Sequence, residues 1–395
     1  MLRKRRLVPL ATCVVGAVVM LGIASCGSSG TSIPSGSSGT AKTSPSSAAS
    51  SGAVSAVNTA MKLAVGADYT APGPAIQGVS KLAGKTVWYI PLSSQITTTQ
   101  LVQASLAKAL ATVGIRLHTC SGDTNPSTIA GCITSAANAN AAGVIFDSIT
   151  ADFISNGIKQ LEAAHIPIEI SDEPDSAGGG PGTDQLSYVP GNPQQALTVV
   201  AQWIATDAGG PAGVLLNEVT DSPPTIEYIS DGFTPALKQA CAGCTIAINK
   251  IQSANFSLMA SSTSAALIAD PAAKYVVSEF DAYAPQAMQG VQQAGRLSQV
   301  KGASMGGLLA QLQLLKAGTF LYADAGTNFA YQGWAEADEI LRQLTGTAPV
   351  SYDVPLRLFT RDNVQSLTLT VAAQDSGEWY GSTAFTSMFA KLWGQ

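Results

Sequence analysis

Apolar and polar residues are arranged along this chain in blocks that predict strands and helices in turn. From residue 84, short apolar runs rich in β-forming residues are each followed by a stretch with apolar side chains at helical spacing, as at Leu101, Leu106 and Leu110. The predicted strands are 86–92, 115–119, 143–146, 166–170, 213–216, 245–251, 275–280 and 300–304. The predicted helices are 97–113, 125–140, 152–164, 194–206, 224–240, 257–269, 284–294 and 307–317.

This alternation predicts an α/β fold in which parallel sheets are covered by helices on both faces. Ligands of such sheets bind in the crevice beyond the carboxyl ends of the strands. The residues that follow the predicted strands are mostly polar or acidic, as a hydrogen-bonding pocket requires, although loops after strands are polar in many proteins. They lie at 93–95, 147–148, 172–173, 217–218, 252–255, 279–283 and 304–305.

Length and charge restrict the possible functions. A chain of 395 residues is longer than one typical domain, so two lobes are expected. Four of the 21 basic residues lie at positions 3–6, and without them 17 basic residues face 26 acidic ones, a net charge of -9. No basic stripe remains, which argues against nucleic acid as a partner.

The N-terminus has the pattern of an export signal. Basic residues 3–6 precede an uncharged apolar run over 7–25, which ends in Ile23-Ala24-Ser25-Cys26. This ending resembles the bacterial lipobox, so we expect a signal peptide over 1–25 and a lipid on Cys26. The alternative is an uncleaved transmembrane helix, because the apolar run is nearly long enough to span a bilayer. Residues 26–56, rich in Ser, Gly, Thr and Ala, are predicted to be a flexible linker, with a lead-in segment over 57–83.

Six short segments, in order, resemble those of one protein family. They are 85–95, Asp-Thr-Asn-Pro at 123–126, Ala-Ala-Gly-Val-Ile-Phe-Asp at 141–147, Ala-His-Ile-Pro-Ile at 164–168, Ser-Asp-Gly-Phe at 230–233 and Phe-Asp-Ala-Tyr-Ala at 280–284. Over residues 84–369 the chain resembles the type I periplasmic binding proteins, in particular the sugar-binding cluster that includes ribose-binding protein.

The resemblance implies two doubly wound parallel-sheet lobes joined by three crossovers, near residues 189, 326 and 355. The N-terminal lobe would comprise 84–189 with 327–355, and the C-terminal lobe 190–326 with 356–369. The remaining segment, 370–395, is similar to tails of actinobacterial members and is expected to cap one lobe. The implied function is that of a monomeric, lipid-anchored binding protein, which closes on a small polar ligand and presents it to an ABC permease and its ATPase.

The same resemblance assigns ligand-binding positions, and two of them depart from the sugar-binding pattern. Glu173 and Glu227 stand where the family often has arginine, so an anionic ligand is disfavoured. The first loop also lacks the usual aromatic residues. A neutral sugar, polyol or sugar derivative remains open, and so does a cationic ligand. The assigned positions are Ser94, Gln95, Thr98, Asp172, Glu173, Glu227, Tyr228, Phe256, Phe280, Asp281, Thr327 and Asn328.

The sequence gives little support for catalysis. Only two histidines occur, His118 and His165, and both are interpreted as structural. Four cysteines form two local pairs, Cys120 with Cys132 and Cys241 with Cys244, which we expect to be disulfides outside the cell. A redox-active Cys241-Ala-Gly-Cys244 or half of a zinc site are the alternatives. We therefore predict no enzyme, metal or cofactor, with a signalling receptor or an extracytoplasmic enzyme on the same fold as the alternative functions.

Overall fold

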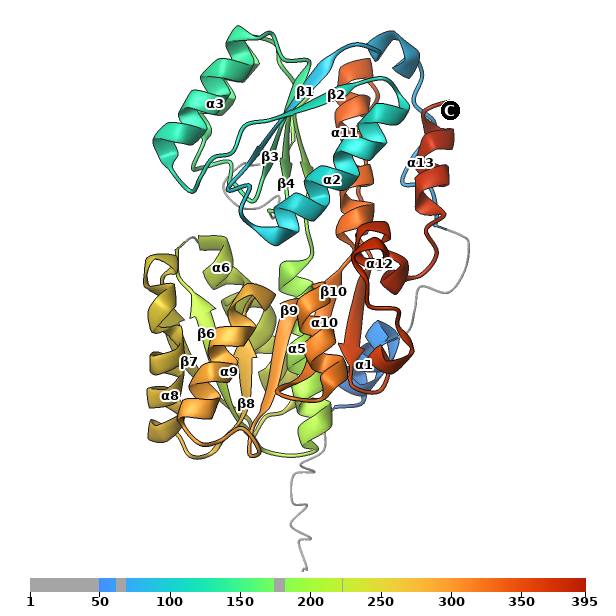
Figure 1. Ribbon diagram of the computed structural model, residues 1–395. Coiled ribbons are helices and arrows are strands. Elements are labelled where there is room, and N and C mark those ends of the chain that lie inside the picture. Colours follow the sequence, from blue (N-terminus) through green and yellow to red (C-terminus); the bar gives the residue numbers. More distant parts are fainter. Residues whose placement is uncertain (1–49, 62–68, 174–181, 222) are drawn as a thin grey trace, which may run out of the picture. The chain divides into compact units, whose positions relative to one another are not determined.

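The computed structural model describes residues 50–61, 69–173, 182–221 and 223–395. These residues form two sheets, each flanked by helices (Figure 1). The strand orders are β2-β1-β3-β4-β5 and β11-β10-β9-β8-β6-β7. Cys26 and the rest of the predicted export signal lie outside the described residues. Within the described ranges, no helix combines the length and apolarity needed to cross a membrane.

The N-terminal lobe is built on the first sheet, in which every strand pairing is parallel. Apolar residues of α2 and α11 pack on one face, and those of α3 and α4 pack on the other. Its strands are β1 Thr86–Pro91, β2 Arg116–Thr119, β3 Gly143–Asp147, β4 Ile168–Ser171 and β5 Leu186–Val189. Its helices are α2 Thr97–Thr112, α3 Pro126–Asn138, α4 Ser155–Ala163 and α11 Phe329–Thr345.

The C-terminal lobe is built on the second sheet, which is parallel except at one edge, where β11 runs antiparallel to β10. Helices α5 and α7 cover one face, and α8, α9 and α10 cover the other. The strands are β6 Gly213–Val219, β7 Thr245–Ile251, β8 Ala273–Ser278, β9 Lys301–Gly306, β10 Leu321–Thr327 and β11 Leu356–Thr360. The helices are α5 Pro193–Ala208, α6 Pro223–Glu227, α7 Thr234–Ala240, α8 Met259–Ala269, α9 Ala284–Gln293 and α10 Leu309–Ala317.

Three crossovers connect the lobes, as the fold prediction requires. They follow β5, β10 and α11, at residues 190–192, at Asn328 and at residues 346–355. The side chain of Asn192, in the first crossover, accepts a hydrogen bond from Thr327 and donates one to the carbonyl oxygen of Val354. One buried amide therefore joins all three crossovers.

The predicted helix over 224–240 is present, but it is not α-helical throughout. The segment consists of α6, a π-helical stretch Tyr228–Phe233, and α7. Pro235 in α7 has no amide hydrogen to donate to the carbonyl four residues earlier, which disfavours α-helical bonding across this stretch. Gly232 also lies so close to α5 that a Cβ atom there would be 2.8 Å from the carbonyl oxygen of Gln194. The interruption places Tyr228 at the start of the π-helical stretch.

Two segments outside the predicted lobes are packed against them. Helix α1, Ser51–Met61, buries Ala53 and Val57 in the core of the C-terminal lobe, and Ile76, Val79 and Leu82 belong to the core of the N-terminal lobe. The flexible linker predicted over 26–56 is thus wrong for 51–56. An alanine-rich segment with apolar residues four apart can form a helix once tertiary packing supports it.

The C-terminal extension contacts both lobes rather than capping one. It contains α12 Val371–Ser376, a 3₁₀ turn Glu378–Tyr380 and α13 Phe385–Leu392. Trp379 and Tyr380 are buried in the core of the C-terminal lobe, whereas Phe389 and Trp393 are buried in that of the N-terminal lobe.

Candidate functional site

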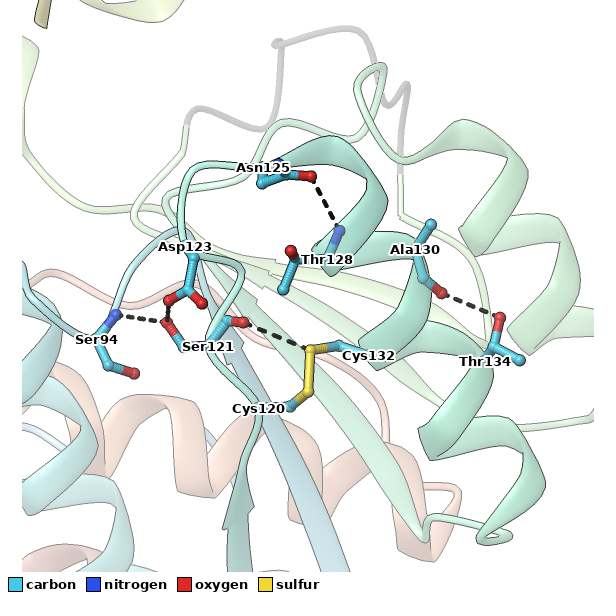
Figure 2. The surroundings of a disulfide bond; sticks show 9 residues. All are labelled: Ser94, Cys120, Ser121, Asp123, Asn125, Thr128, Ala130, Cys132 and Thr134. Carbon is cyan, nitrogen blue, oxygen red and sulfur yellow. Dashed lines mark hydrogen bonds between the residues drawn. A yellow bond between two sulfur atoms is a disulfide. The ribbon is translucent and has the colours of Figure 1, made fainter. Parts of the chain in front are cut away.

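The first predicted ligand loop follows β1 and is braced by a disulfide. The amide of Ser94 donates a 3.0 Å hydrogen bond to the hydroxyl of Ser121, which donates to Asp123 at 2.5 Å. Ser121 is adjacent to Cys120, whose disulfide with Cys132 ties the end of β2 to α3 (Figure 2). Gln95 is exposed and Thr98 is partly exposed, so both are accessible.

The second cysteine pair is also a disulfide, between Cys241 and Cys244. It closes the turn after α7, at the end of the C-terminal lobe where β7 begins. Both local disulfides were predicted from the sequence. Since all four of these cysteines are paired, none is a free thiol ligand for zinc.

Asp147 and Asp172 lie together beyond the carboxyl ends of β3 and β4. The hydroxyl of Ser148 donates to Oδ1 of Asp147 at 2.7 Å and lies 3.4 Å from Oδ2 of Asp172. Tyr89 of β1 donates a hydrogen bond to Asp147. Asp172 has a φ of 59°, a left-handed conformation that turns the chain sharply after the strand. Burial raises the pKa of Asp172 to about 8, and the nearby Asp147 carboxyl adds to this effect.

Gly191 supports the position of Asp172. A Cβ atom on Gly191 would lie 1.9 Å from Oδ1 of Asp172, so only glycine leaves room for that carboxyl. Gly191 belongs to the first crossover. The predicted binding residue and the connection between the lobes are therefore in direct contact.

Helix α11 contributes polar groups that the sequence analysis missed. Ser171, the last residue of β4, donates a hydrogen bond to Glu336, and Nε2 of Gln332 lies 3.3 Å from the Ser171 hydroxyl. Gln332 also bonds to Asp172 and lowers its pKa somewhat against the dominant effect of burial. Both α11 side chains are fully buried. The local sequence does not indicate that Gln332 and Glu336 lie beside the end of β4, because polar and charged residues of a helix normally face solvent.

Glu173, Glu227 and Tyr228 are brought together from the two lobes. Glu173 is 6% exposed, and burial raises its pKa to about 9, with further contributions from Asp172, Asp147 and Glu227. Tyr228 is also buried, which raises the pKa of its hydroxyl. The acidic residues that raise it further are Glu173, Asp172, Glu279 and Glu227. Predicted residues of both lobes thus act electrostatically on Tyr228, together with Glu279, which the assignment omitted.

Phe256 and Phe280 form an aromatic cluster with Tyr283, another residue that the assignment omitted. The ring centroids of Phe256 and Tyr283 are 5.0 Å apart, and those of Phe280 and Tyr283 are 6.0 Å apart. All three rings are partly exposed. The Tyr283 hydroxyl lies 3.5 Å from that of Ser253, which hydrogen-bonds to Asp221. The loops after β6, β7 and β8 thus join to form an aromatic and acidic surface.

Three of the assigned residues have surroundings that favour a structural role. The carboxyl of Asp281 accepts hydrogen bonds from Ser304 and from the amide of Leu308, inside the C-terminal lobe. Asn328 caps α11 by accepting from the amide of Tyr331 at 3.0 Å. Thr327 is engaged by the crossover amide described above. Ligand contact at these positions stays a prediction.

A separate cavity of about 770 Å³ lies at the amino ends of β1, β3 and β4. Both histidines line it, and the ring centroid of His118 is 4.1 Å from that of Trp88. This is the edge of the sheet opposite to Asp147 and Asp172. It does not belong to the site at the carboxyl ends.

The fold can now be compared with known proteins. The sequence profile of the family described as "Periplasmic binding protein domain" matches residues 87–348, well over half of the chain. The chain belongs to this family. No curated protein sequence matches it.

Solved structures of periplasmic binding proteins share the fold at low sequence identity. A sugar ABC transporter protein from Yersinia enterocolitica subsp. enterocolitica 8081 superposes with a TM-score of 0.66 and 16% identity, over 81% of this chain and 99% of that one. A solute-binding protein from Agrobacterium vitis bound with alpha-D-tagatopyranose gives 0.64 and 18%, over 72% and 97%. One from Bacillus halodurans C-125 with bound myo-inositol gives 0.63 and 16%, over 72% and 96%. The predicted type I fold with parallel-dominated sheets is thereby confirmed.

Proposed function

We propose that this periplasmic binding protein is the lipid-anchored solute receptor of an ABC importer and holds a small, polar, hydroxylated ligand between its lobes. The observation that carries the proposal is that carboxyls of both lobes, Asp172 and Glu173 in one and Glu227 and Glu279 in the other, all lie near enough to Tyr228 to raise the pKa of its hydroxyl. A ligand in contact with Asp172 on one side and Glu227 on the other would favour an arrangement in which the lobes are close. Such a difference in contacts is what a ligand needs to shift a conformational equilibrium.

The bound sugar and the bound cyclitol of the Agrobacterium and Bacillus proteins support this ligand class. Carboxyl and hydroxyl groups are suitable partners for ligand hydroxyls, and here they include Asp172, Ser94 and Thr98. The partly exposed rings of Phe256 and Phe280 would pack against an apolar ring face. The proposed partners are an ABC permease and its ATPase.

Ligand binding can be tested with the full chain extracted from membranes in detergent. We expect at least one sugar, polyol or amino derivative to raise the melting temperature, because a ligand that binds only the native state stabilises it. Replacing Asp172 by Ala should lower the affinity for that ligand at least about tenfold without unfolding the protein. Unchanged calorimetric affinity would exclude a ligand contact at Asp172.

The lipid anchor is tested separately. Labelled palmitate should be incorporated into the wild-type protein and not into a Cys26→Ala variant. A Cys13→Ala variant is the matched control, because Cys13 lies within the apolar run and should not affect labelling. Equal labelling of wild type and Cys26→Ala would contradict the anchor.

A further inference from the structure

The acidic residues around Tyr228 have no basic partner. Asp172 and Glu173 follow β4, Glu227 ends α6 and Glu279 follows β8, so the four carboxyls that raise the pKa of the buried Tyr228 hydroxyl come from three separate segments. In the part of the chain that the structure describes, the acidic residues engaged in ion pairs are others, namely Asp207, Glu218 and Asp338. The counter-charge for this group is therefore not supplied by a described side chain.

Two of these carboxyls are buried and incompletely hydrogen-bonded. Glu173 is 6% exposed and Glu279 is fully buried, and each has one side-chain oxygen without a hydrogen-bond partner. The other oxygen of Glu279 accepts a 2.5 Å bond from the amide of Val219. Burying a carboxylate without a partner is strongly unfavourable, so these carboxyls hold protons in the unliganded protein and can ionise once a donor or a cation is supplied from outside the chain.

The aromatic cluster lies next to the acidic group in the sequence and at the same end of the sheet. Phe280 directly follows Glu279, and Tyr283 connects Phe280 to Phe256 through ring contacts of 6.0 and 5.0 Å. The faces of aromatic rings attract cations, and the attraction is greatest where water is excluded. Carboxyls beside partly exposed aromatic rings are a combination suited to an ammonium group.

We infer that the ligand carries a protonated amine in addition to its hydroxyl groups, as an amino sugar or an amino polyol does, and that the amine lies between Glu173 and Glu227. The inference rests on the proposed function, since it assigns the ligand of the same site. A neutral sugar offers no charge that would ionise these carboxyls, and an anion would find no counter-charge among them. A metal ion fits less well, because no group of three or more potential metal ligands occurs among the described residues.

Proton release distinguishes an amine from a neutral ligand. Asp172, Asp147 and Glu227 raise the pKa of Glu173, and Asp147 raises that of Asp172, which in turn raises the pKa of Glu336, so the charges that shift these values are all acidic. Burial raises the pKa of Asp172 to about 8 and that of Glu173 to about 9, so both hold protons at neutral pH in the unliganded protein. An ammonium group favours the ionised carboxylates. Its binding should therefore release protons and tighten as the pH rises from about 6 to about 8.

The experiment is calorimetry on the detergent-extracted full chain with matched pairs of probes. The pairs are D-glucosamine with D-glucose, D-galactosamine with D-galactose, and 1-amino-1-deoxy-D-sorbitol with D-sorbitol. At least one amine should bind about tenfold or more tightly than its neutral counterpart. Its binding enthalpy should differ between phosphate and MOPS buffers, because those buffers take up released protons with different enthalpies.

Two substitutions assign the effect to the acidic group. Glu173→Gln and Glu227→Gln should each lower the affinity for the amine at least about tenfold more than they lower the affinity for its neutral counterpart. Glu227 is partly exposed, so its substitution keeps the test valid even if Glu173→Gln affects folding. Glu162→Gln on α4 is the matched control and should change neither affinity.

The outcomes separate this inference from the proposed function. Neutral probes that bind as tightly as their amine counterparts would overturn the inference while leaving the solute-binding function in place. Amine affinity that is unchanged in both glutamine variants would overturn it as well. If no probe of either kind binds at up to about 10 mM, the inference is wrong and the proposed ligand class fails with it.

Discussion

The hydroxyl of Thr327 donates a 2.5 Å hydrogen bond to Oδ1 of Asn192. The same amide group donates from Nδ2 to the carbonyl oxygen of Val354 at 2.9 Å. Asn192, Thr327 and Val354 belong to, or directly flank, the three crossovers of the fold. A single side chain thus holds together the segments through which one lobe would move against the other.

Replacing Asn192 by Ala should lower the free energy of unfolding by about 1–3 kcal/mol, because two buried polar groups lose their partner. Urea denaturation measures this change. Asn192→Asp keeps the acceptor for Thr327 but faces a carbonyl oxygen with a carboxyl, so this variant should be less stable at pH 8 than at pH 4. If the free energies of unfolding of both variants lie within about 0.5 kcal/mol of that of the wild type, the Asn192 amide contributes little to stability.

Removing the Cys120–Cys132 disulfide should weaken ligand binding as well as stability. The double serine variant should lose roughly 3 kcal/mol, because this disulfide closes a loop longer than that of Cys241–Cys244, whose removal should cost roughly 2 kcal/mol. Only the first disulfide braces the loop that positions Ser94. Chemical denaturation and calorimetry on the two double variants test this, and equal effects on affinity would contradict it.

Substitution of Gly191 should impair binding without changing any residue that we place in ligand contact. The Cβ of Gly191→Ala would displace the Asp172 carboxyl, so we expect at least about a tenfold loss of affinity. Gly131→Ala is the control, because that glycine lies in α3 with open space around its Cβ position. It should leave affinity unchanged and stabilise the helix by about 0.5–1 kcal/mol. Similar affinities for the two variants would show that Asp172 does not need its observed position.

The unliganded protein should become less stable as the pH rises. Buried carboxyls hold their protons in the folded state, with pKa values of about 6 for Asp147, about 7 for Asp281, about 8 for Asp172 and about 9 for Glu173. The unfolded chain loses these protons near pH 4, so between about pH 4 and pH 9 the folded state binds more protons and its stability falls. Melting temperatures measured across this pH range test whether the stability falls as the pH rises.

Glu173→Gln removes one of these groups without changing its shape. At pH 8 the unliganded variant should melt above the wild type, whereas at pH 4 the two should be similar. The same substitution should weaken binding of an amine, so it separates stability from function. A Glu173→Gln variant that melts below the wild type at both pH values would contradict this expectation. It would show that the Glu173 carboxyl stabilises the folded state.

The strand and helix pattern was predictable where apolar runs alternate with amphipathic stretches, which covers most of both sheets. The helix α11 was not found by that pattern, because Glu336, Asp338, Glu339 and Arg342 are all buried in it. Charged residues on a helix normally indicate a solvated face. Here Asp338 instead bonds to Arg342 at 2.7 Å and to the indole of Trp393, so tertiary contacts override the local signal.

The sequence indicated only some residues of the candidate site, and their contact with a ligand stays a prediction. Position after a strand was enough to select Asp172 and Glu173, and the family resemblance selected Glu227 and Tyr228. Gln332 could not be found in this way, because it approaches Asp172 from a helix about 160 residues further along the chain. Only the folded chain shows that such distant positions are neighbours.

The C-terminal extension has a mechanical consequence. Tyr380 is fixed in one lobe and Phe385 in the other, and only the few residues from Gly381 to Ala384 lie between them. The five residue steps from Tyr380 to Phe385 span no more than roughly 18 Å when the chain is fully extended. The C-terminal extension therefore limits how far the two lobes can separate where it joins them. Any opening of the lobes must have its axis close to this connection.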